Sequence, residues 1–296
     1  MPDTPTPPAS PILSLSGALR HAVAAAAPSV VAVHSHRARS SGFVWRPGLV
    51  VTADEALAEE GDVAVTAQGG RRLGATLVGR DPSTDVALLR IDDDALPAAA
   101  LAPEPVAAGS LALALGSQDG APLAALGLVA LAGPAWRSMR GGEIDARIEL
   151  DLALRRRAEG GLALDAAGQA LGMTVFGPRR RVLVIPGATV ARVAEKLLAH
   201  GRIPRGYLGL GLQPVRRDDG GAGLMVMSVE PGGPGAAAGL RQGDVVAAID
   251  GEPVAGLQAL QRALGPGSVG TPVRLTLRRA GEAVEAALTI GERPHP

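Results

Sequence analysis

The side chains that could carry out chemistry in this chain of 296 residues are carboxylates, hydroxyls, histidines and arginines, because the chain has no cysteine. The absence of cysteine excludes disulfides, thiol nucleophiles and thiolate metal sites. Carboxyl groups can move protons or hold a cation, and a guanidinium can neutralise them through paired hydrogen bonds. Three motifs hold the carboxylates of interest, the last of them with three consecutive arginines: Thr52–Glu55, Gly79–Leu89 and Asp151–Gly161.

Composition limits both the size of the protein and its partners. The length fits two domains of typical size, and 47% apolar residues suffice to build their cores. Aromatic residues make up only 2%, so alanine, leucine and valine must fill these cores. The chain has 29 basic and 29 acidic residues and no net charge. A neutral chain gives no argument for a nucleic-acid partner or an anionic membrane, and we expect neither.

The first two thirds of the chain predict a β-rich domain. From Ser29 to Val184, short apolar runs alternate with glycine, proline and aspartate. Many short strands at regular spacing argue for an all-β barrel or sandwich. The expected strands are Val30–Val33, Leu49–Thr52, Val63–Thr66, Leu73–Val78, Val86–Ile91, Leu111–Leu115 and Val182–Ile185. Before them we expect a disordered leader and a short helix that Ser14 or Ser16 caps and that runs to about Ala27.

The hydrophobic period changes after this β-rich part. Ala188–His200 places apolar residues on one helical face and is followed by Gly201, which predicts a helix. Ile203–Gly206 is typical of a linker, and a second module follows from Tyr207 to about Gly291. In that module we expect strands near Leu208–Leu212, Leu224–Val229, Val245–Ile249, Val273–Arg278 and Ala283–Ile290, and helical segments near Gly235–Leu240 and Leu257–Leu264.

Several of these segments resemble the HtrA/Deg family of serine proteases. The motifs that carry the resemblance stand in the family's order: Ser41–Val44, Val50–Thr52, Gly79–Leu89, Ala112–Ser117, Arg205–Gly209 and Pro231–Val246. The resemblance covers roughly residues 15–291 and implies a mainly β fold, a trypsin-like double six-stranded β-barrel followed by a C-terminal PDZ domain. On this basis we expect a disordered leader (1–14), a protease-like domain (15–203) and a PDZ domain (204–296).

The resemblance also indicates which catalytic residues have changed. The family's mechanism needs a serine nucleophile, a histidine base and an orienting aspartate. Asp85 stands where the family has its aspartate, but Glu55 stands at the histidine position and Glu159 at the serine position. Arg157 replaces the glycine of the oxyanion hole, where a side chain restricts the backbone. We therefore expect that no catalytic triad is intact.

If the family fold is kept, Glu55, Asp85 and Glu159 converge and repel one another. They can then have raised pKa values, pair with arginines of Arg155–Arg157, or bind a divalent cation. We favour pairing with arginine, and expect no metal and no cofactor. A hydrolase built on paired carboxyl groups stays an alternative. The histidines, none of them at a catalytic position of the family, are expected at the surface: His21, His34, His36, His200 and His295.

The second module keeps the features that the family uses to bind peptides. In a PDZ domain a C-terminal peptide adds as a strand beside a loop whose N–H groups hold its carboxylate. Here the loop is Tyr207-Leu208-Gly209-Leu210, and its glycine permits close approach of the peptide backbone. Leu208 and Leu210 would form an apolar pocket for the last side chain with three leucines of the facing helix, unless all five are core residues only. The helix leucines are Leu257, Leu260 and Leu264.

Together these features predict an HtrA-like pseudoprotease that binds peptides or protein C-termini through its PDZ domain, as a scaffold or regulatory subunit. The alternative is an active serine endopeptidase, or another hydrolase, that uses a non-standard site. The resemblance also implies a homo-oligomer, a trimer. We find no convincing signal peptide and no run long enough to span a bilayer. The sequence therefore favours a cytoplasmic location, with the periplasm as the alternative.

Overall fold

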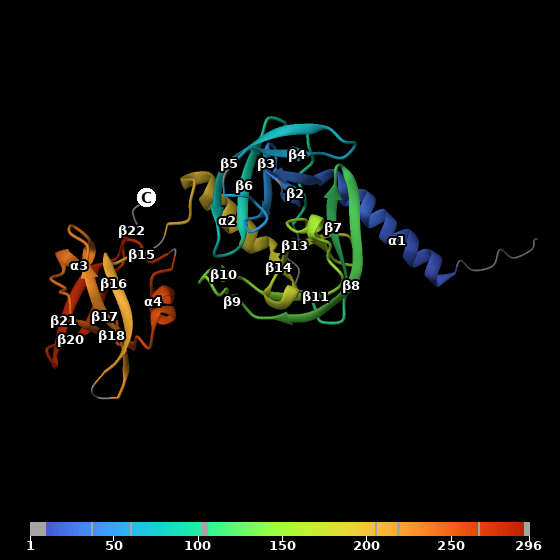
Figure 1. Cartoon of the computed structure of the whole chain (residues 1–296). Helices are drawn as coiled ribbons and strands as arrows, with labels where there is room; N and C mark the ends of the chain where they lie inside the picture. Colours follow the sequence, from blue (N-terminus) through green and yellow to red (C-terminus); the bar gives the residue numbers. More distant parts are fainter. Residues whose placement is uncertain are drawn as a thin grey trace, which may run out of the picture. The chain divides into compact units, whose positions relative to one another are not determined.

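The chain folds into two compact units, Met1–Arg202 and Ile203–Pro296, and each is described by itself. The structure is a computed structural model that describes residues 10–36, 38–59, 61–101, 106–204, 206–217, 220–265 and 267–292. The first unit contains two closed β-barrels together with the helices α1 and α2 (Figure 1). Most of the leader predicted for residues 1–14 lies outside the described residues.

Six antiparallel strands form the first barrel, which closes in the order β1-β2-β3-β6-β5-β4. They are β1 (Val30–Ser35), β2 (Ala38–Arg46), β3 (Leu49–Ala53), β4 (Val63–Thr66), β5 (Arg72–Asp81) and β6 (Val86–Ile91). Both β1 and β3 are buried along their whole length. Valine-rich runs form these strands because β-branched side chains pack well on a pleated surface. The barrel interior includes Val31, Val33, Val44, Val50 and Val65.

The second barrel closes in the order β11-β14-β13-β12-β7-β8. Its strands are β7 (Leu111–Gln118), β8 (Ala121–Gly133), β11 (Arg147–Asp151), β12 (Leu162–Leu164), β13 (Ala170–Phe176) and β14 (Val182–Pro186). Between β8 and β11 the chain forms a hairpin of β9 (Trp136–Arg137) and β10 (Glu143–Ile144). The two closed barrels confirm the predicted double six-stranded β-barrel.

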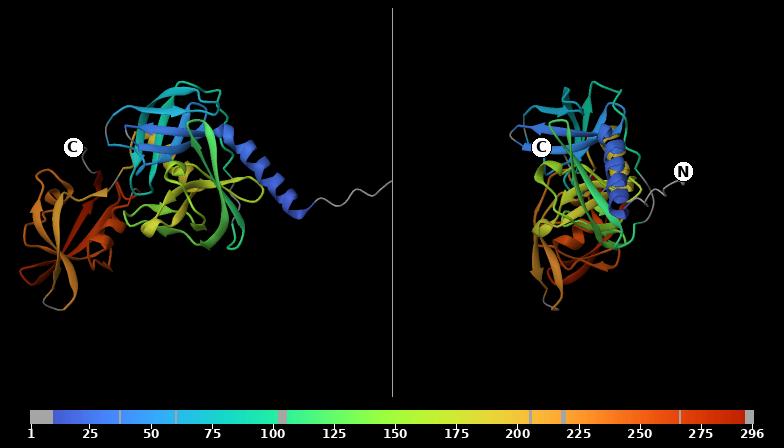
Figure 2. Two further views of the ribbon diagram at one scale, coloured as in Figure 1. Left: turned by 45° about the vertical axis from the view of Figure 1, so that its right-hand side comes forward. Right: turned by 90° about the vertical axis from the view of Figure 1, so that its right-hand side faces the viewer.

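Helix α1 (Pro11–Ala26) begins earlier than predicted, because Ser10 rather than Ser14 or Ser16 occupies the N-cap position. Pro11 suits the first turn, since the N–H that proline lacks would have no helical partner there. The last turns of α1 pack on the second barrel, where Ala22 lies against Gly168. The first turns extend away from the barrels (Figure 2).

Helix α2 (Gly187–His200) joins the two barrels, because it contacts β5 and β6 of the first and β13 and β14 of the second. Its buried face contains Val190, Val193 and Leu197, as the spacing of the apolar residues predicted. Gly201 ends the helix in the left-handed region, with φ of 70°. Among the described residues, the helices are too short or too polar to cross a bilayer.

The second unit holds a sheet in the order β16-β17-β18-β20-β21, with β19 paired to β18, and a separate ribbon of β15 and β22. The strands are β15 (Gly206–Tyr207), β16 (Leu210–Arg216), β17 (Ala222–Val229), β18 (Val245–Ile249), β19 (Glu252–Pro253), β20 (Pro272–Arg279), β21 (Glu282–Thr289) and β22 (Gly291–Glu292). Helix α3 (Pro234–Ala237) contacts β21, and helix α4 (Leu257–Ala263) contacts β16.

Two elements of this unit differ from the prediction. The expected strand Leu208–Leu212 is interrupted, because Gly209 adopts φ of 70° and turns the chain between β15 and β16. The helical segment expected near Gly235–Leu240 is the shorter α3, and Gly239 follows it with φ of 73°. The arrangement is that of a PDZ domain, so the second half of the predicted fold is also confirmed.

Candidate functional site

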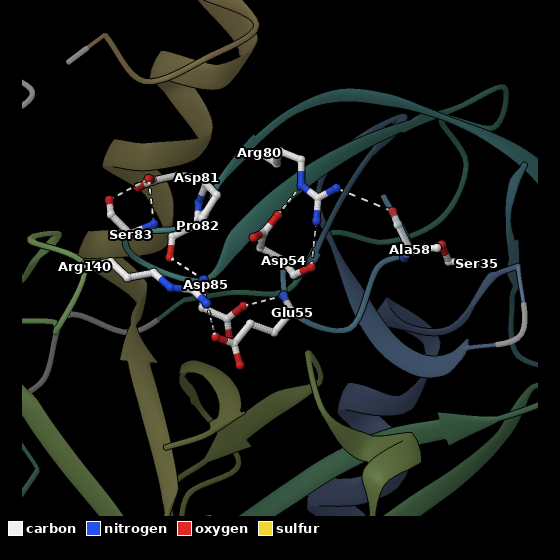
Figure 3. A network of polar contacts seen from close by, with 10 residues as sticks. All are labelled: Ser35, Asp54, Glu55, Ala58, Arg80, Asp81, Pro82, Ser83, Asp85 and Arg140. Atoms are coloured by element: carbon white, nitrogen blue, oxygen red, sulfur yellow. Dashed lines mark hydrogen bonds and ion pairs between the residues drawn. The ribbon is translucent and has the colours of Figure 1, made fainter. Parts of the chain in front are cut away.

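Asp85 lies at the end of a tight turn that the sequence builds from its own polar side chains. The carboxylate of Asp81 accepts hydrogen bonds from the Ser83 backbone N–H at 3.0 Å and from the hydroxyls of Ser83 and Thr84 at 2.6 and 2.7 Å. Asp85 follows with φ of 59°, in the left-handed region that aspartate tolerates better than most residues. The turn therefore sets the direction in which Asp85 points (Figure 3).

Glu55 is fixed against Asp85 by its main chain rather than by its side chain. Its backbone N–H donates to the Asp85 carboxylate at 2.7 Å, and the Asp54 N–H donates to the Asp85 carbonyl at 3.2 Å. Asp54 is itself buried and pairs with Arg80, whose guanidinium also donates to the carbonyls of Asp54 and Ala58 at 3.1 and 3.4 Å. These bonds anchor residues 54–58 on β5 (Figure 3).

The three carboxylates of the predicted site interact electrostatically. Burial raises the pKa of Asp85 from 3.8 to about 7, and the charges of Glu55, Glu159 and Asp54 add to the shift, against the hydrogen bond from the Glu55 N–H. Burial also raises the pKa of Glu159; the backbone N–H of Phe176 and the charge of Arg156 oppose this shift. Glu55, Asp85 and Glu159 are thus close enough to interact through their charges, and burial with like charges makes the ionised forms of Asp85 and Glu159 costly.

Glu55 forms an ion pair with an arginine that the sequence did not suggest. Arg140, in the turn between β9 and β10, lies 3.2 Å from Glu55 and donates to the carbonyl of Pro82 at 3.3 Å. The Ser138 hydroxyl donates to the Ser83 carbonyl at 2.5 Å and holds the same hairpin on the Asp85 turn. Arg157 instead forms an ion pair with Asp119 at 3.5 Å. Arg157 thus pairs outside the three carboxylates, whereas Arg156 of the same run acts on Glu159 through its charge.

The main chain around Glu159 forms a closed turn. A 3₁₀ turn, Arg156–Ala158, precedes Glu159, and the Glu159 N–H donates to the Arg156 carbonyl at 3.2 Å. The buried Ser41 hydroxyl donates to the Arg157 carbonyl at 2.6 Å and accepts the Ser117 N–H at 2.8 Å. An oxyanion hole needs N–H groups aimed at the reacting oxygen, and this N–H points back into the turn instead. Sequence reasoning missed the role of Ser41, although its place in a family motif marked the position.

The histidines provide no base for the site within the described residues. His34 is buried, against expectation, and its Nε2 lies 2.9 Å from the Thr66 hydroxyl inside the first barrel. His21, His36 and His200 are exposed, and His295 lies outside the described residues. Over the described ranges, histidine and carboxylate side chains form no group of three that could hold a metal ion.

The peptide-binding residues predicted in the second unit separate into three environments. Leu208 and Leu260 are 3% and 6% exposed and belong to the hydrophobic core, so they do not line an open pocket. Leu210 and Leu264 are partly buried at the edge of that core, and Leu257 is 43% exposed. Strand β16 ends the sheet, and α4 lies beside it. An edge strand with a helix beside it, as a peptide groove requires, is thus present in β16 with α4.

The loop that precedes β16 is fixed by main-chain bonds. The Glu230 N–H donates to the Gly209 carbonyl and the Gly235 N–H to the Leu208 carbonyl, each at 2.8 Å. The Tyr207 hydroxyl bonds to the Glu230 carboxylate. A Cβ on Gly209 would lie 3.1 Å from Gly233, so both its φ and its neighbours require glycine.

Comparisons with known proteins agree with this architecture. A trypsin-like peptidase domain model matches residues 40–173, and a PDZ domain model matches residues 206–290. A probable periplasmic serine endoprotease DegP-like of Rhizobium meliloti (strain 1021) is 30% identical over 275 residues, 87% of this chain and 54% of that protein. Its counterpart in Halomonas elongata is 32% identical over 279 residues, with 88% and 58% covered.

Solved structures agree over the whole chain. An HtrA-type protease AlgW with decapeptide is 25% identical, with a TM-score of 0.71, and covers 94% of this chain and 99% of its own. A serine endoprotease from Yersinia pestis is 26% identical, with a TM-score of 0.72, and covers 99% and 100%. The chain belongs to the HtrA family. It spans about half the length of the curated relatives it matches.

The names of these HtrA relatives bear on two expectations. They are called periplasmic, which favours the periplasmic alternative and gives no support to the cytoplasmic location predicted from the sequence. They are also called serine endoproteases, whereas this HtrA chain has Glu55 and Glu159 at two of the three triad positions. The catalytic role of the site is therefore taken up as a proposal below.

The raised pKa of Asp85 predicts a pH-dependent stability for the barrels. A carboxyl whose pKa is raised by folding stabilises the protein fully below about pH 4, and this contribution is lost as the pH rises to about 7. Asp85→Asn keeps an acceptor for the Glu55 N–H and cannot ionise, so we expect it to be more stable than the wild type at pH 8 by about 1–3 kcal/mol. Urea unfolding at pH 5 and pH 8 measures this.

Tryptophan fluorescence reports on the barrels alone, because Trp45 and Trp136 both lie in the first unit. Asp92→Asn, at an exposed aspartate, is the matched control and should keep the wild-type pH dependence. An Asp85→Asn variant with the same loss of stability between pH 5 and pH 8 as the wild type would contradict the assignment.

Proposed function

We propose that this HtrA-family chain is a pseudoprotease that captures peptides or protein C-termini through its PDZ domain, as a scaffold or regulatory subunit. The observation that carries the proposal is the glutamate at the nucleophile position, Glu159, with a second glutamate, Glu55, at the position of the base. A carboxylate has no hydroxyl to add to a peptide carbonyl, and a glutamate side chain paired with Arg140 is a poor substitute for imidazole.

Two further observations support the loss of hydrolysis. The Glu159 N–H is bonded within its own turn, so it is not presented to a substrate oxygen. Among the described residues, the hydroxyl that lies within hydrogen-bonding distance of a histidine is that of Thr66, and both Thr66 and His34 are about 6% exposed. A buried pair of this kind is closed to a protein substrate.

The alternative is an active endopeptidase or another hydrolase, and two findings favour it. The relatives of this chain are named as serine endoproteases. In addition, the pKa of Asp85 near 7 would let a carboxyl group exchange a proton at neutral pH. An enzyme of this kind would have to use Asp85 with Glu159 or Glu55, in place of a serine and a histidine.

A direct assay separates the two functions. We expect no cleavage of unfolded casein and no labelling by a serine-directed fluorophosphonate, because Glu159 offers no nucleophilic oxygen of the hydroxyl type. Glu159→Ala and Asp85→Asn, purified in parallel, set the level of contaminating protease. Casein cleavage by the wild type that either substitution abolishes would establish the alternative and overturn the pseudoprotease proposal.

Peptide capture is supported by the structure of the PDZ unit and by its relatives. Strand β16 is an edge strand with α4 beside it, and Gly209 keeps the loop before it in a left-handed conformation. A peptide can add to such an edge as an extra strand. The related AlgW structures are described as the protease with a decapeptide or with a tripeptide.

Substitution of Gly209 tests peptide capture. Gly209→Ala strains the loop at φ of 70° and crowds Gly233, so we expect peptides with a free C-terminus to bind about tenfold more weakly. An array of such peptides, with amidated duplicates, measures the effect. Gly251→Ala is the matched control, because it has φ of 84° with nothing within 4 Å of the added Cβ. No binding by the wild type, or equal loss in the control, would refute capture.

We also propose that two apolar surfaces of the first unit associate with other copies of the chain. The resemblance to the HtrA/Deg family, which implies a trimer, points in the same direction. On α1, Ile12, Leu13 and Leu15 are 77%, 71% and 45% exposed. On β8, which contains no charged residue, Leu126 and Leu128 are 46% and 45% exposed. Exposed apolar groups gathered in this way usually mark an interface.

Light scattering after size exclusion measures the assembly. We expect the wild type to be a homo-oligomer, and Leu15→Glu with Leu128→Glu to shift it to monomers, because two charges would be buried at the interface. The control pair Ala24→Glu and Leu77→Glu, both at exposed sites on α1 and β5, should leave the mass unchanged. A monomeric wild type would contradict the proposal.

A further inference from the structure

Six arginines gather on two neighbouring loops at one end of the second barrel. We call these segments, residues 152–158 and 177–181, the arginine loops. They are neighbours because Leu150 of β11 and Phe176 of β13 both pair with Val182 of β14. The two loops therefore leave the barrel at the same end. All six arginines are exposed: Arg155, Arg156, Arg157, Arg179, Arg180 and Arg181.

Most of this positive charge is not compensated. Arg157 pairs with Asp119, and Arg181 lies 3.5 Å from a Glu149 carboxylate that Arg147 already binds at 2.6 Å. The other four arginines have no carboxylate within ion-pair distance among the residues that the structure describes. The chain as a whole is neutral, with 29 basic and 29 acidic residues, so this concentration is local.

The backbone of the second loop is held in an unfavourable conformation that presents these side chains. Arg179 and Arg180 have φ of 57° and 59°, two consecutive left-handed residues that are not glycine. L-residues rarely adopt this region, so the conformation is strained. The guanidinium of Arg180 lies 5.0 Å over the ring of Phe176, which limits its freedom and leaves its N–H groups free to bind an acceptor.

One arginine from each loop acts through its charge on the same residue, Glu159. Arg156 of the first and Arg180 of the second both lie close enough to Glu159 to lower its pKa against the effect of burial. Arg156 and Arg180 therefore bring positive charge to Glu159 from both loops. Planar guanidinium groups bind carboxylates through paired hydrogen bonds, and several of them at one place recognise a run of acidic side chains.

We propose that the arginine loops are a binding surface for an acidic segment of a partner protein. The arginines occupy two short loops with Glu149, Asp151 and Glu159 beside them. These carboxylates would repel the continuous phosphate backbone of a nucleic acid, whereas a short acidic segment can be bound by the arginines alone. The loops also lack an aromatic platform on which bases could stack, since the ring of Phe176 is covered by Arg180. This surface is separate from the PDZ groove, so the inference does not depend on peptide capture there.

Fluorescence anisotropy with the full chain tests the inference. The probe is a short labelled peptide of alternating glutamate and serine with an amidated C-terminus, which removes the carboxylate that a PDZ loop would hold. We expect Arg156→Glu with Arg180→Glu to weaken binding about tenfold or more, and added salt to weaken wild-type binding. Arg155→Gln with Arg179→Gln, which removes charge without reversing it, should weaken binding in the same direction.

The matched control is Arg20→Glu with Arg90→Glu, which changes the net charge equally at exposed arginines of α1 and β6. It should keep wild-type affinity, and unfolding followed by tryptophan fluorescence confirms that each variant is folded. Three results would overturn the inference: no binding of the acidic peptide, equal loss in the control, or tighter binding of a short DNA duplex. Binding of C-terminal peptides to the PDZ domain is scored separately and can fail or succeed on its own.

Discussion

The hydrogen bond from the Glu55 backbone N–H to the Asp85 carboxylate fixes the centre of the first unit. The turn around Asp81 supplies one side of this contact, and the buried Asp54–Arg80 pair supplies the other. Because both sides are anchored on strands of the first barrel, the Asp85 carboxylate is held in a buried position. Burial, with the charges of Glu55, Glu159 and Asp54 added to it, raises the pKa of Asp85, and an arginine from a distant hairpin, Arg140, is bound to Glu55.

Positive charge in this unit is used in two different ways. Arg80 and Arg140 turn toward the carboxylates and the carbonyls of the site, where each forms several specific bonds. The arginine loops carry charge that is left open to the solvent, in a chain that is neutral overall. Arg140 offsets the charge of Glu55 within the site, and the exposed guanidinium groups form the surface that we propose for an acidic partner.

The sequence alone was sufficient to predict the architecture and to point to the three carboxylates. Valine-rich runs with period-breaking residues predicted the barrel strands, and motif order placed Glu55, Asp85 and Glu159. Arg140 could not be predicted, because its partner is 85 positions away and the contact exists only after a hairpin of the second barrel packs on a turn of the first. The same reason applies to Ser41, whose hydroxyl joins β2, β7 and the turn before Glu159.

Other errors came from local rules that tertiary packing overrides. His34 was expected at the surface, but β1 is buried on both faces, so the alternation of a half-exposed strand does not apply. Ser10, Ser14 and Ser16 are all acceptable helix caps by type, and only the structure distinguishes them. Leu208 and Leu260 are apolar residues next to a groove, and sequence alone does not separate the lining of a pocket from the core beneath it.

The closed turn before Glu159 has a consequence for substitutions that would restore family residues at positions 157 and 159. Its bonds involve main-chain carbonyls, the hydroxyl of Ser41 and Gly160, where an added Cβ would come within 2.3 Å of the Ser41 carbonyl. None of these contacts requires the side chain at position 157 or 159, so exchanging those side chains one by one leaves the turn closed. If the site has lost hydrolysis as we propose, restoring a family residue at one of these positions alone would leave the N–H at position 159 bonded within its turn, without a donor for a substrate oxygen.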